Sequence, residues 1–107
     1  MTNSKPVPAT KRANLPREVA HDAAFQKDWA RHQKAGRTNL AKAKEAMLLL
    51  IANDRPLPPE WRDHALQGEW ADHRELHFGG DALLIYTADA TRVTFVRLGT
   101  HSELFGR

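Results

Sequence analysis

One stretch of the sequence alternates polar and apolar side chains and then stops at two glycines. Residues 70–78 end at Gly79-Gly80, a pair that tolerates the positive φ angles of a tight hairpin turn. Successive side chains of a β-strand point to opposite faces, so one face of this strand would carry His73, Glu75 and His77. Leu76 and Phe78 would lie on the other face, against a core. The stretch therefore predicts a strand with proton-transferring groups on one side.

Two more strands are predicted after the glycines. Residues 82–87 and 92–98 are rich in β-branched and aromatic side chains, and a turn-like Ala88-Asp89-Ala90 joins them. With the preceding strand they make an antiparallel meander. Residues 15–20 are interpreted as a short edge strand, because Pro16 lacks the N–H donor that an inner strand needs.

Two helices are predicted between the edge strand and the meander. Asp22 is a suitable N-cap for the first helix, and Gly36 closes it. Thr38 or Asn39 caps the second helix, which continues through about Ala52 with an apolar stripe.

A proline-rich segment then prevents the second helix from continuing. Pro56, Pro58 and Pro59 restrict the residues before them and lack N–H donors, so a loop is expected as far as about Glu69. Loops of this length are more often functional than idle, and this one contains His64.

These elements indicate an α+β fold with two N-terminal helices on one face of an antiparallel sheet. The other face of the sheet would be open. With 107 residues, the chain is expected to form one domain over residues 14–107. Residues 1–13 combine prolines, basic residues and small polar residues, which predicts a flexible tail.

The composition narrows the class of protein. There is no cysteine, which fits a reducing cytoplasm and excludes thiolate zinc sites, thiol catalysis and iron–sulfur ligation. The longest apolar run, residues 46–52, is too short to span a bilayer, and the polar N-terminus lacks a signal-peptide core. The sequence predicts a cytoplasmic protein that does not enter the membrane.

Charge is unevenly distributed along the chain. Residues 1–44 hold ten Lys or Arg against three acids, whereas residues 45–107 hold six against ten. A basic front half beside a carboxylate- and histidine-bearing back half suggests a basic surface that binds a polyanion next to a reactive site. On charge alone, however, solvated charged helices are the favoured explanation. The candidate RNA- or ribosome-binding residues are Lys27, Arg31, Lys34, Arg37, Lys42 and Lys44.

An ordered set of motifs covers the chain from the prolines to the C-terminus. The motifs are Leu57-Pro58-Pro59, Trp61 to Gly68, Trp70 with Arg74 to His77, Asp81 with Leu84 to Tyr86, and Arg97 to Gly106. This set resembles the RelE/ParE superfamily of bacterial type II toxins and, within it, the YafQ-like mRNA interferases. Looser similarity reaches back to Phe25.

The resemblance implies a RelE-like microbial RNase fold and a ribosome-dependent endoribonuclease. Such a toxin cuts mRNA in the ribosomal A site through the neighbouring 2′-OH, without metal or other cofactor, and so inhibits translation. An acidic antitoxin encoded in the same operon is the implied partner. The family's catalytic positions fall on His64, His77, Asp81 and His101, with Phe105 in support.

The chemistry requires a base for the hydroxyl proton, an acid for the leaving oxygen and a cation for the phosphorane. Imidazoles suit the first two tasks at neutral pH. His77 or His64 is the expected base and His101 the expected acid, while Asp81 orients an imidazole or is itself the base. Supporting roles are assigned to Glu75, Arg74 and Arg97, the two arginines as alternatives at the phosphate.

No metal site is expected. The pair His73 and His77 would lie about 13 Å apart along a strand, too far to share an ion. His21, His32 and His73 are interpreted as structural.

Two other functions fit the same pattern. One is a ParE-like toxin that inhibits a protein target such as gyrase, and the other is a catalytically silent RNA- or ribosome-binding module. The cluster of proton-transferring side chains favours the nuclease.

Overall fold

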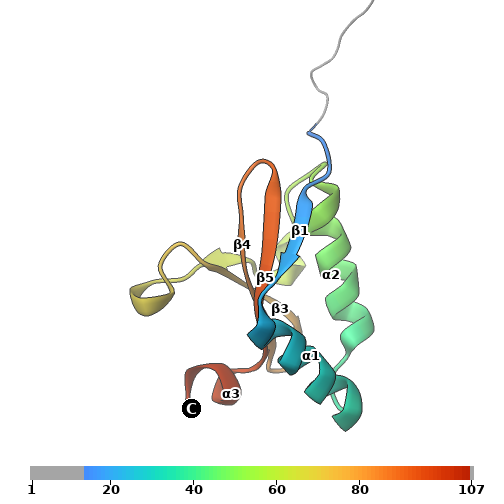
Figure 1. The fold of residues 1–107 in the computed structure, drawn as a ribbon, viewed down its shortest axis with the longest axis vertical. Helices are drawn as coiled ribbons and strands as arrows, with labels where there is room; N and C mark the ends of the chain where they lie inside the picture. Colours follow the sequence, from blue (N-terminus) through green and yellow to red (C-terminus); the bar gives the residue numbers. More distant parts are fainter. Residues whose placement is uncertain (1–13, 107) are drawn as a thin grey trace, which may run out of the picture.

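The computed structural model describes residues 14–106, so the predicted tail, residues 1–13, lies outside the described residues. Strands, α-helices and 3-10 turns follow one another along the chain (Figure 1). They are β1 Glu18–His21, α1 Ala23–Ala35, α2 Leu40–Ala52, η1 Pro59–Trp61, β2 His64–Ala65, η2 Gly68–Trp70, β3 Arg74–Gly79, β4 Ala82–Ala88, β5 Arg92–Thr100 and α3 His101–Phe105.

The strands form one five-stranded sheet in the order β1-β5-β4-β3-β2. Strands β2 to β5 pair antiparallel. The predicted hairpin is present, but its turn residues are Gly80 and Asp81, because Gly79 still belongs to β3 and pairs with Ala82. Strand β1, however, pairs parallel to β5, with Glu18 opposite Arg92. The sheet is therefore mixed, and the predicted antiparallel arrangement applies to β2–β5 only. The direction of β1 follows from its long connection through both helices, which local alternation does not encode.

The helices begin and end at the predicted residues, but the side chain of Asp22, at the N-cap of α1, makes no capping hydrogen bond. Gly36 adopts φ 72° after α1, where its N–H donates to the carbonyl oxygen of His32. The side chain of Asn39 accepts a hydrogen bond from the Lys42 N–H at 3.0 Å, and Asn53 ends α2 in the left-handed region at φ 57°. These contacts satisfy backbone groups that a helix end leaves without partners.

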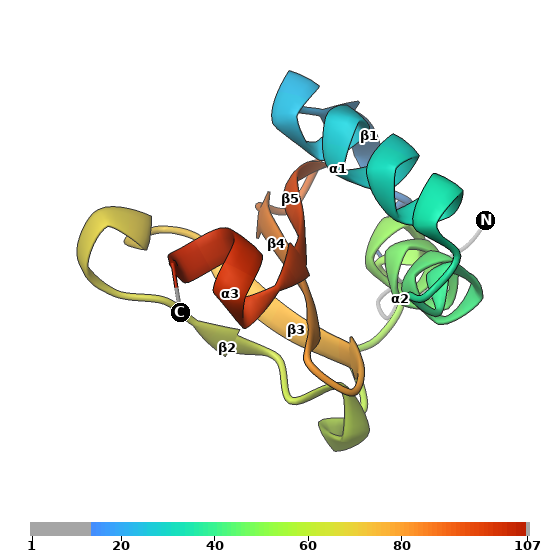
Figure 2. The same cartoon turned by 90° about the horizontal axis from the view of Figure 1, so that it is seen from below.

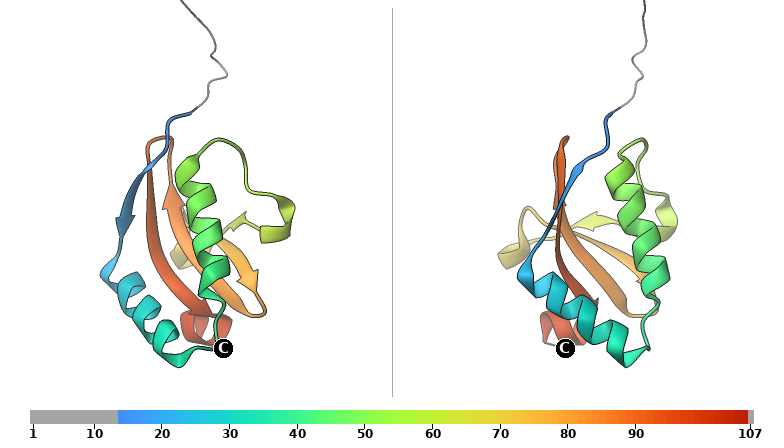
Figure 3. Two further views of the ribbon diagram at one scale, coloured as in Figure 1. Left: turned by 90° about the vertical axis from the view of Figure 1, so that its right-hand side faces the viewer. Right: turned by 45° about the vertical axis from the view of Figure 1, so that its right-hand side comes forward.

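Both long helices cover the same face of the sheet, and Figure 3 shows α2 lying across the strands. The core on this face joins Phe25 of α1 and Leu50 of α2 to Leu76 and Phe78 of β3. Burial of these apolar groups is the main stabilising contribution of the fold. The predicted packing of two helices on one sheet face is confirmed.

The opposite face of the sheet is only partly open. Leu83 and Ile85 of β4 pack there against Leu104 of α3, and Figure 2 shows α3 on the side of the sheet away from α2. The residues that follow β5 form a short helix, which begins at His101.

The segment between α2 and β3 is more ordered than a long loop. It contains two 3-10 turns, and its strand β2 pairs with β3 so that His64 lies opposite Glu75. Strand β3 begins at Arg74 and not at Trp70, because Trp70 ends η2 and Asp72 adopts φ 73°. The expectation that His73 belongs to the strand is therefore wrong. Within residues 14–106, no helix has the length and apolar character to cross a membrane.

Candidate active site

A buried carboxylate lies between two imidazoles on the face of the sheet opposite α1 and α2. The Glu75 Oε2 atom is 3.2 Å from Nε2 of His64 and 3.4 Å from Nε2 of His77. Glu75 is 4% exposed, while the side chains of His77 and His64 are 13% and 51% exposed. A proton can therefore pass between the two rings through one carboxylate, at a point that solvent reaches from the His64 side.

Backbone pairing explains this arrangement. Glu75 and His77 point to one side of β3 because they are two residues apart, and the β2–β3 register puts His64 opposite Glu75. The Nδ1 atom of His64 lies 2.8 Å from the carbonyl oxygen of Arg62, so Nδ1–H donates to that oxygen. The ring of His64 is thereby oriented with Nε2 toward Glu75.

A third imidazole approaches from α3. The rings of His77 and His101 have centroids 6.2 Å apart, and those of His64 and His77 are 5.9 Å apart. Asp81, in the β3–β4 turn, lies with Oδ1 3.0 Å from Nδ1 of His101 and orients that ring. Phe105, one turn along α3, packs against the same ring, and the two ring centroids are 5.6 Å apart.

The charge environment distinguishes His77 from the other imidazoles. Burial is the largest cause that lowers the pKa of His77, and the positive charge of Arg62 is the next. The Glu75 carboxylate opposes both by raising the pKa of His77. The net shift is downward, so His77 is mostly neutral at pH 7 and can accept a proton.

Arg62 is a site residue that sequence reasoning missed. It adopts φ 51°, a left-handed conformation uncommon for a residue with a side chain, and it lines a small open pocket of about 240 Å³ together with His77, Gly80 and Lys42. An arginine does not favour this backbone conformation, so the sequence does not predict it.

The two arginines predicted to support a phosphate lie elsewhere. Arg74 binds Asp63 through Nε and Nη2, the latter at 3.0 Å, and Arg97 binds Asp28 at 2.7 and 3.1 Å. Each guanidinium therefore binds a carboxylate, and each of these contacts joins two different segments of the chain. A larger hollow of about 760 Å³ includes Asp63, Arg74 and Arg62 in its lining but none of the histidines.

The predicted basic residues differ in their surroundings. Lys27, Lys34 and Arg37 are exposed. Lys42 extends over the ring of Trp61 at 4.8 Å, and Lys44 lies 5.9 Å from the ring of Trp29. Arg31, half exposed, forms an ion pair with Asp28 at 3.0 Å.

Three side chains of the site could also hold a metal ion. One ligand atom from each of His64, Glu75 and His77 lies within 4.8 Å of the others, so the set could close on an ion of the zinc or copper type. The spacing of His73 and His77 along the sequence does not reveal this group, because β2 completes it by pairing with β3.

The geometry defines a class of protein, a small α+β domain in which three imidazoles and two carboxylates cluster on one face of the sheet. Residues 17–106 match the family described as a bacterial toxin of type II toxin-antitoxin systems, YafQ. The chain therefore belongs to the YafQ family.

Individual relatives agree with this assignment. The chain is 38% identical to the mRNA interferase toxin YafQ of Escherichia coli K12 over 92 residues, covering 86% of this chain and 99% of the relative. A crystal structure of the E. coli DinJ-YafQ complex is similar, with a TM-score of 0.77, 39% identity and coverage of 84% of this chain and 99% of that one. A metal-bound toxin from Helicobacter pylori matches with a TM-score of 0.73, 33% identity and coverage of 83% and 99%.

These findings bear on the predictions made from the sequence. The predicted family, the RelE-like α+β fold and the class of function, a type II toxin with mRNA interferase activity, are confirmed. An antitoxin partner is supported by the solved complex of the relative. The individual site residues, the domain boundary and the ribosome as partner stay predictions.

Proposed function

We propose that the protein is a ribosome-dependent endoribonuclease that cuts mRNA in the ribosomal A site and thereby inhibits translation in the cytoplasm. The observation that carries this proposal is the Glu75 carboxylate shared by His64 and His77, with His101 beside them. Cleavage of RNA through its own 2′-OH needs two proton transfers, and neighbouring imidazoles of different environment are suited to both.

His77 is the base in this scheme. Burial and Arg62 lower its pKa, which favours the neutral ring, and so it takes the proton of the 2′-OH as that oxygen bonds to the adjacent phosphorus. Glu75 stabilises the imidazolium that forms, at 3.4 Å. The proton then passes through the same carboxylate to His64, whose side chain is exposed to solvent.

His101 is the acid. Its Nδ1 is turned to Asp81, which leaves Nε2 as the atom that protonates the departing 5′-oxygen when the P–O5′ bond breaks. The products are a 2′,3′-cyclic phosphate and a 5′-hydroxyl. Each proton moves between RNA and a named side chain, so the reaction needs no cofactor.

Arg62 is the cation for the developing phosphorane. Its charge acts on His77, and it shares a pocket with that residue and with Lys42. Preorganised positive charge at the phosphorane lowers the barrier most where water is excluded. This role replaces those predicted for Arg74 and Arg97, whose guanidiniums bind carboxylates.

The exposed basic residues Lys27, Lys34 and Arg37 are proposed to contact ribosomal RNA phosphates. Contacts of this kind position a protein on RNA without reading its sequence. The ribosome would then present mRNA to the histidines, and the protein itself needs little affinity for free mRNA.

The antitoxin is proposed to be acidic, encoded in the same operon, and to fold over the helices. An apolar hollow of about 320 Å³ between α1 and α2 offers Phe25, Trp29 and Met47 as anchors, with Lys44 at its edge. Opposite charge would speed association, and the buried anchors would slow dissociation.

Primer extension on mRNA from translating cells tests the function. The wild-type protein should create discrete new 5′ ends inside coding frames, whereas a ParE-like toxin or a silent RNA-binding module would leave none. His77→Ala and His101→Ala should remove these ends while retaining antitoxin binding. His73→Ala is the matched control, since that ring lies against Trp70 and bonds to its own loop. Intact mRNA with the wild-type toxin would refute the proposal.

A further inference from the structure

The helix that carries two site residues is too short to be stable alone. Helix α3 has five residues, begins at His101 and ends at Phe105. Isolated helices of this length do not persist in water, so contacts from elsewhere must fix the position of His101. Leu104 supplies one such contact, because it is buried against β4.

Glu103 supplies a second set of contacts. Its side chain accepts a hydrogen bond from the Thr100 N–H at 2.9 Å, while the Thr100 hydroxyl accepts one from the Glu103 N–H at 3.3 Å. This reciprocal capping box fixes the first turn of α3. A Cβ atom at Gly99 would lie only 2.6 Å from Glu103 Oε1, so the absence of a side chain at Gly99 leaves room for the carboxylate.

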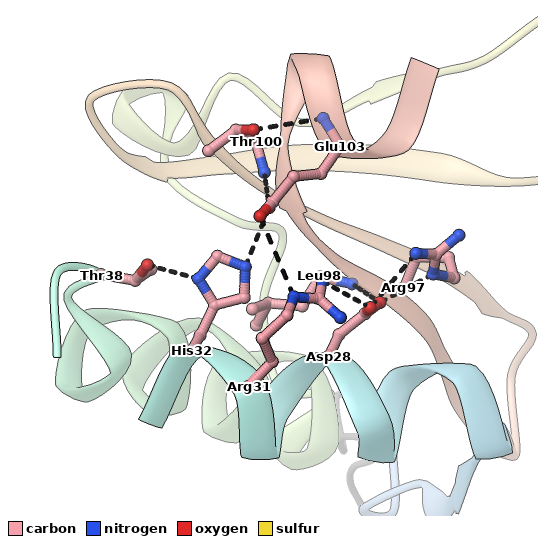
Figure 4. A network of polar contacts seen from close by, with 8 residues as sticks. All are labelled: Asp28, Arg31, His32, Thr38, Arg97, Leu98, Thr100 and Glu103. Carbon is pink, nitrogen blue, oxygen red and sulfur yellow. Dashed lines mark hydrogen bonds and ion pairs between the residues drawn. The ribbon is translucent and has the colours of Figure 1, made fainter. Parts of the chain in front are cut away.

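The same carboxylate oxygen reaches across to α1. Figure 4 shows Glu103 above His32, whose Nε2 lies 2.9 Å from Glu103 Oε1. The other nitrogen, Nδ1, lies 2.5 Å from the hydroxyl of Thr38. His32 is 6% exposed, and both of its ring nitrogens have partners. It therefore joins the connection between α1 and α2, where Thr38 lies, to the start of α3.

The protonation of this bridge follows from its partners. The hydrogen bond from the Thr100 N–H is the largest cause, and that from His32 a further one, by which the pKa of Glu103 falls below its usual value. An ionised carboxylate only accepts hydrogen bonds, so Nε2 of His32 carries the donated proton.

A buried ion pair holds α1 in place one turn before His32. Asp28, 2% exposed, accepts hydrogen bonds from Arg97 and from the Leu98 N–H at 3.0 Å. Residues four apart share a helix face, so Asp28 and His32 approach β5 and α3 together. Figure 4 shows these contacts along a single side of α1.

We propose that His32 and Glu103 are positioning residues for the reaction. They fix α3 to α1 and so hold His101 at the distance from His77 that acid–base catalysis requires. The inference rests on the proposed function, in which His101 is the acid. It assigns a catalytic consequence to a histidine that the sequence marks only as structural.

Hydrogen exchange tests the positioning without any cleavage assay. In His32→Leu, the amides of Thr100 and Glu103 should exchange about tenfold faster or more, while the amide of Ile85 in β4 is unchanged. Gly99→Ala, which removes no polar group, should have the same effect by displacing the carboxylate. Equal acceleration at Ile85, or none at Thr100, overturns the proposal whether or not the protein cuts mRNA.

Kinetics test the catalytic consequence. His32→Leu should lower kcat on programmed ribosomes about 10- to 100-fold with little change in KM. The reason is that the variant displaces the acid, His101, but leaves the surface that binds the ribosome unchanged. His32→Gln should recover most of the rate, since its amide keeps a donor at the Nε2 position. In a His101→Ala background, His32→Leu should have no further effect. Full multiplication of the two losses would mean that His32 does not act through His101.

Glu18→Gln is the matched control for Glu103→Gln. Glu18 also forms an ion pair, with Arg92 at 3.2 Å, but it lies on the edge strand and is exposed. Only Glu103→Gln should lower kcat and speed exchange at Thr100. If both variants behave alike, the effect is one of lost charge and the proposal fails.

Discussion

Removing the hydroxyl of Tyr86 tests how the segment just before His64 is held to the sheet. Tyr86 is 2% exposed, and its hydroxyl donates a hydrogen bond to Asp63 Oδ1 at 2.6 Å. Arg74 holds the same carboxylate from the side. Tyr86→Phe keeps the ring and its packing, so the loss reports this hydrogen bond alone.

The magnitude follows from the charge and exposure of the acceptor. A hydrogen bond to a charged group contributes about 1.5–3 kcal/mol. The Asp63 side chain is 20% exposed and keeps Arg74, so water can partly replace the lost donor. We therefore expect a loss of about 1.5–2 kcal/mol, which lowers Tm by about 6–15 °C in a domain of this size.

The pH dependence gives the same hydrogen bond a second signature. Burial is the largest cause that raises the pKa of Tyr86, and the hydrogen bond to Asp63 is the next. The unfolded chain releases the tyrosine proton near pH 10, before the folded protein does. The stabilisation from Tyr86 is thus complete below about pH 10 and declines as the pH rises further.

Urea unfolding at pH 8 and at about pH 11 measures both effects. Tyr86→Phe should shift the midpoint at pH 8 without changing the slope m, and it should lose less stability than the wild type between the two pH values. The chain has a single tyrosine, so tyrosinate absorbance of the folded protein follows Tyr86 directly. A double-mutant cycle with Asp63→Asn isolates the coupling. An unchanged midpoint, or titration of the folded protein near pH 10, would refute the reasoning.

Three further predictions concern activity. Because Arg62 lowers the pKa of His77, Arg62→Gln should move the acid limb of the pH–rate profile to higher pH; an unmoved limb would exclude His77 as the base. Replacing Lys27, Lys34 and Arg37 together by alanine should flatten the slope of log K against log salt for ribosome binding by about 2, and an unchanged slope would return them to solvated residues. Toxin stripped of divalent ions should keep its activity on magnesium-containing ribosomes, and strict dependence on added zinc or manganese would contradict a reaction carried by side chains alone.

Local signals account for the parts of the fold that the sequence predicts. Gly36 ends α1 in the left-handed region that favours glycine, and Gly79 and Gly80 both adopt positive φ at the hairpin between β3 and β4. Alternation places Glu75 and His77 on one face of β3. Each of these signals involves residues within a few positions of one another, so the sequence alone is enough to predict the structure there.

The missed features depend on residues far apart in the sequence. The direction of β1 is decided by pairing with β5, more than 70 residues later. Arg62 joins the site through a left-handed backbone that its residue type does not favour. The three-ligand group at Glu75 exists only because β2 pairs with β3. Such features arise from the assembled fold.

The histidines show most clearly why residue type alone cannot assign function. His101 and His32 each contact a carboxylate, at 3.0 and 2.9 Å. They differ in the second ring nitrogen: that of His32 is occupied by Thr38, whereas Nε2 of His101 has no partner among residues 14–106. An imidazole whose two nitrogens are both engaged in the interior can orient other groups but cannot exchange a proton with a substrate. One with a carboxylate behind it and an accessible nitrogen in front can do so, because its orientation is fixed while one nitrogen stays accessible. In the roles proposed for these two residues, the partner of the second nitrogen therefore distinguishes catalysis from positioning, and only the fold supplies that partner.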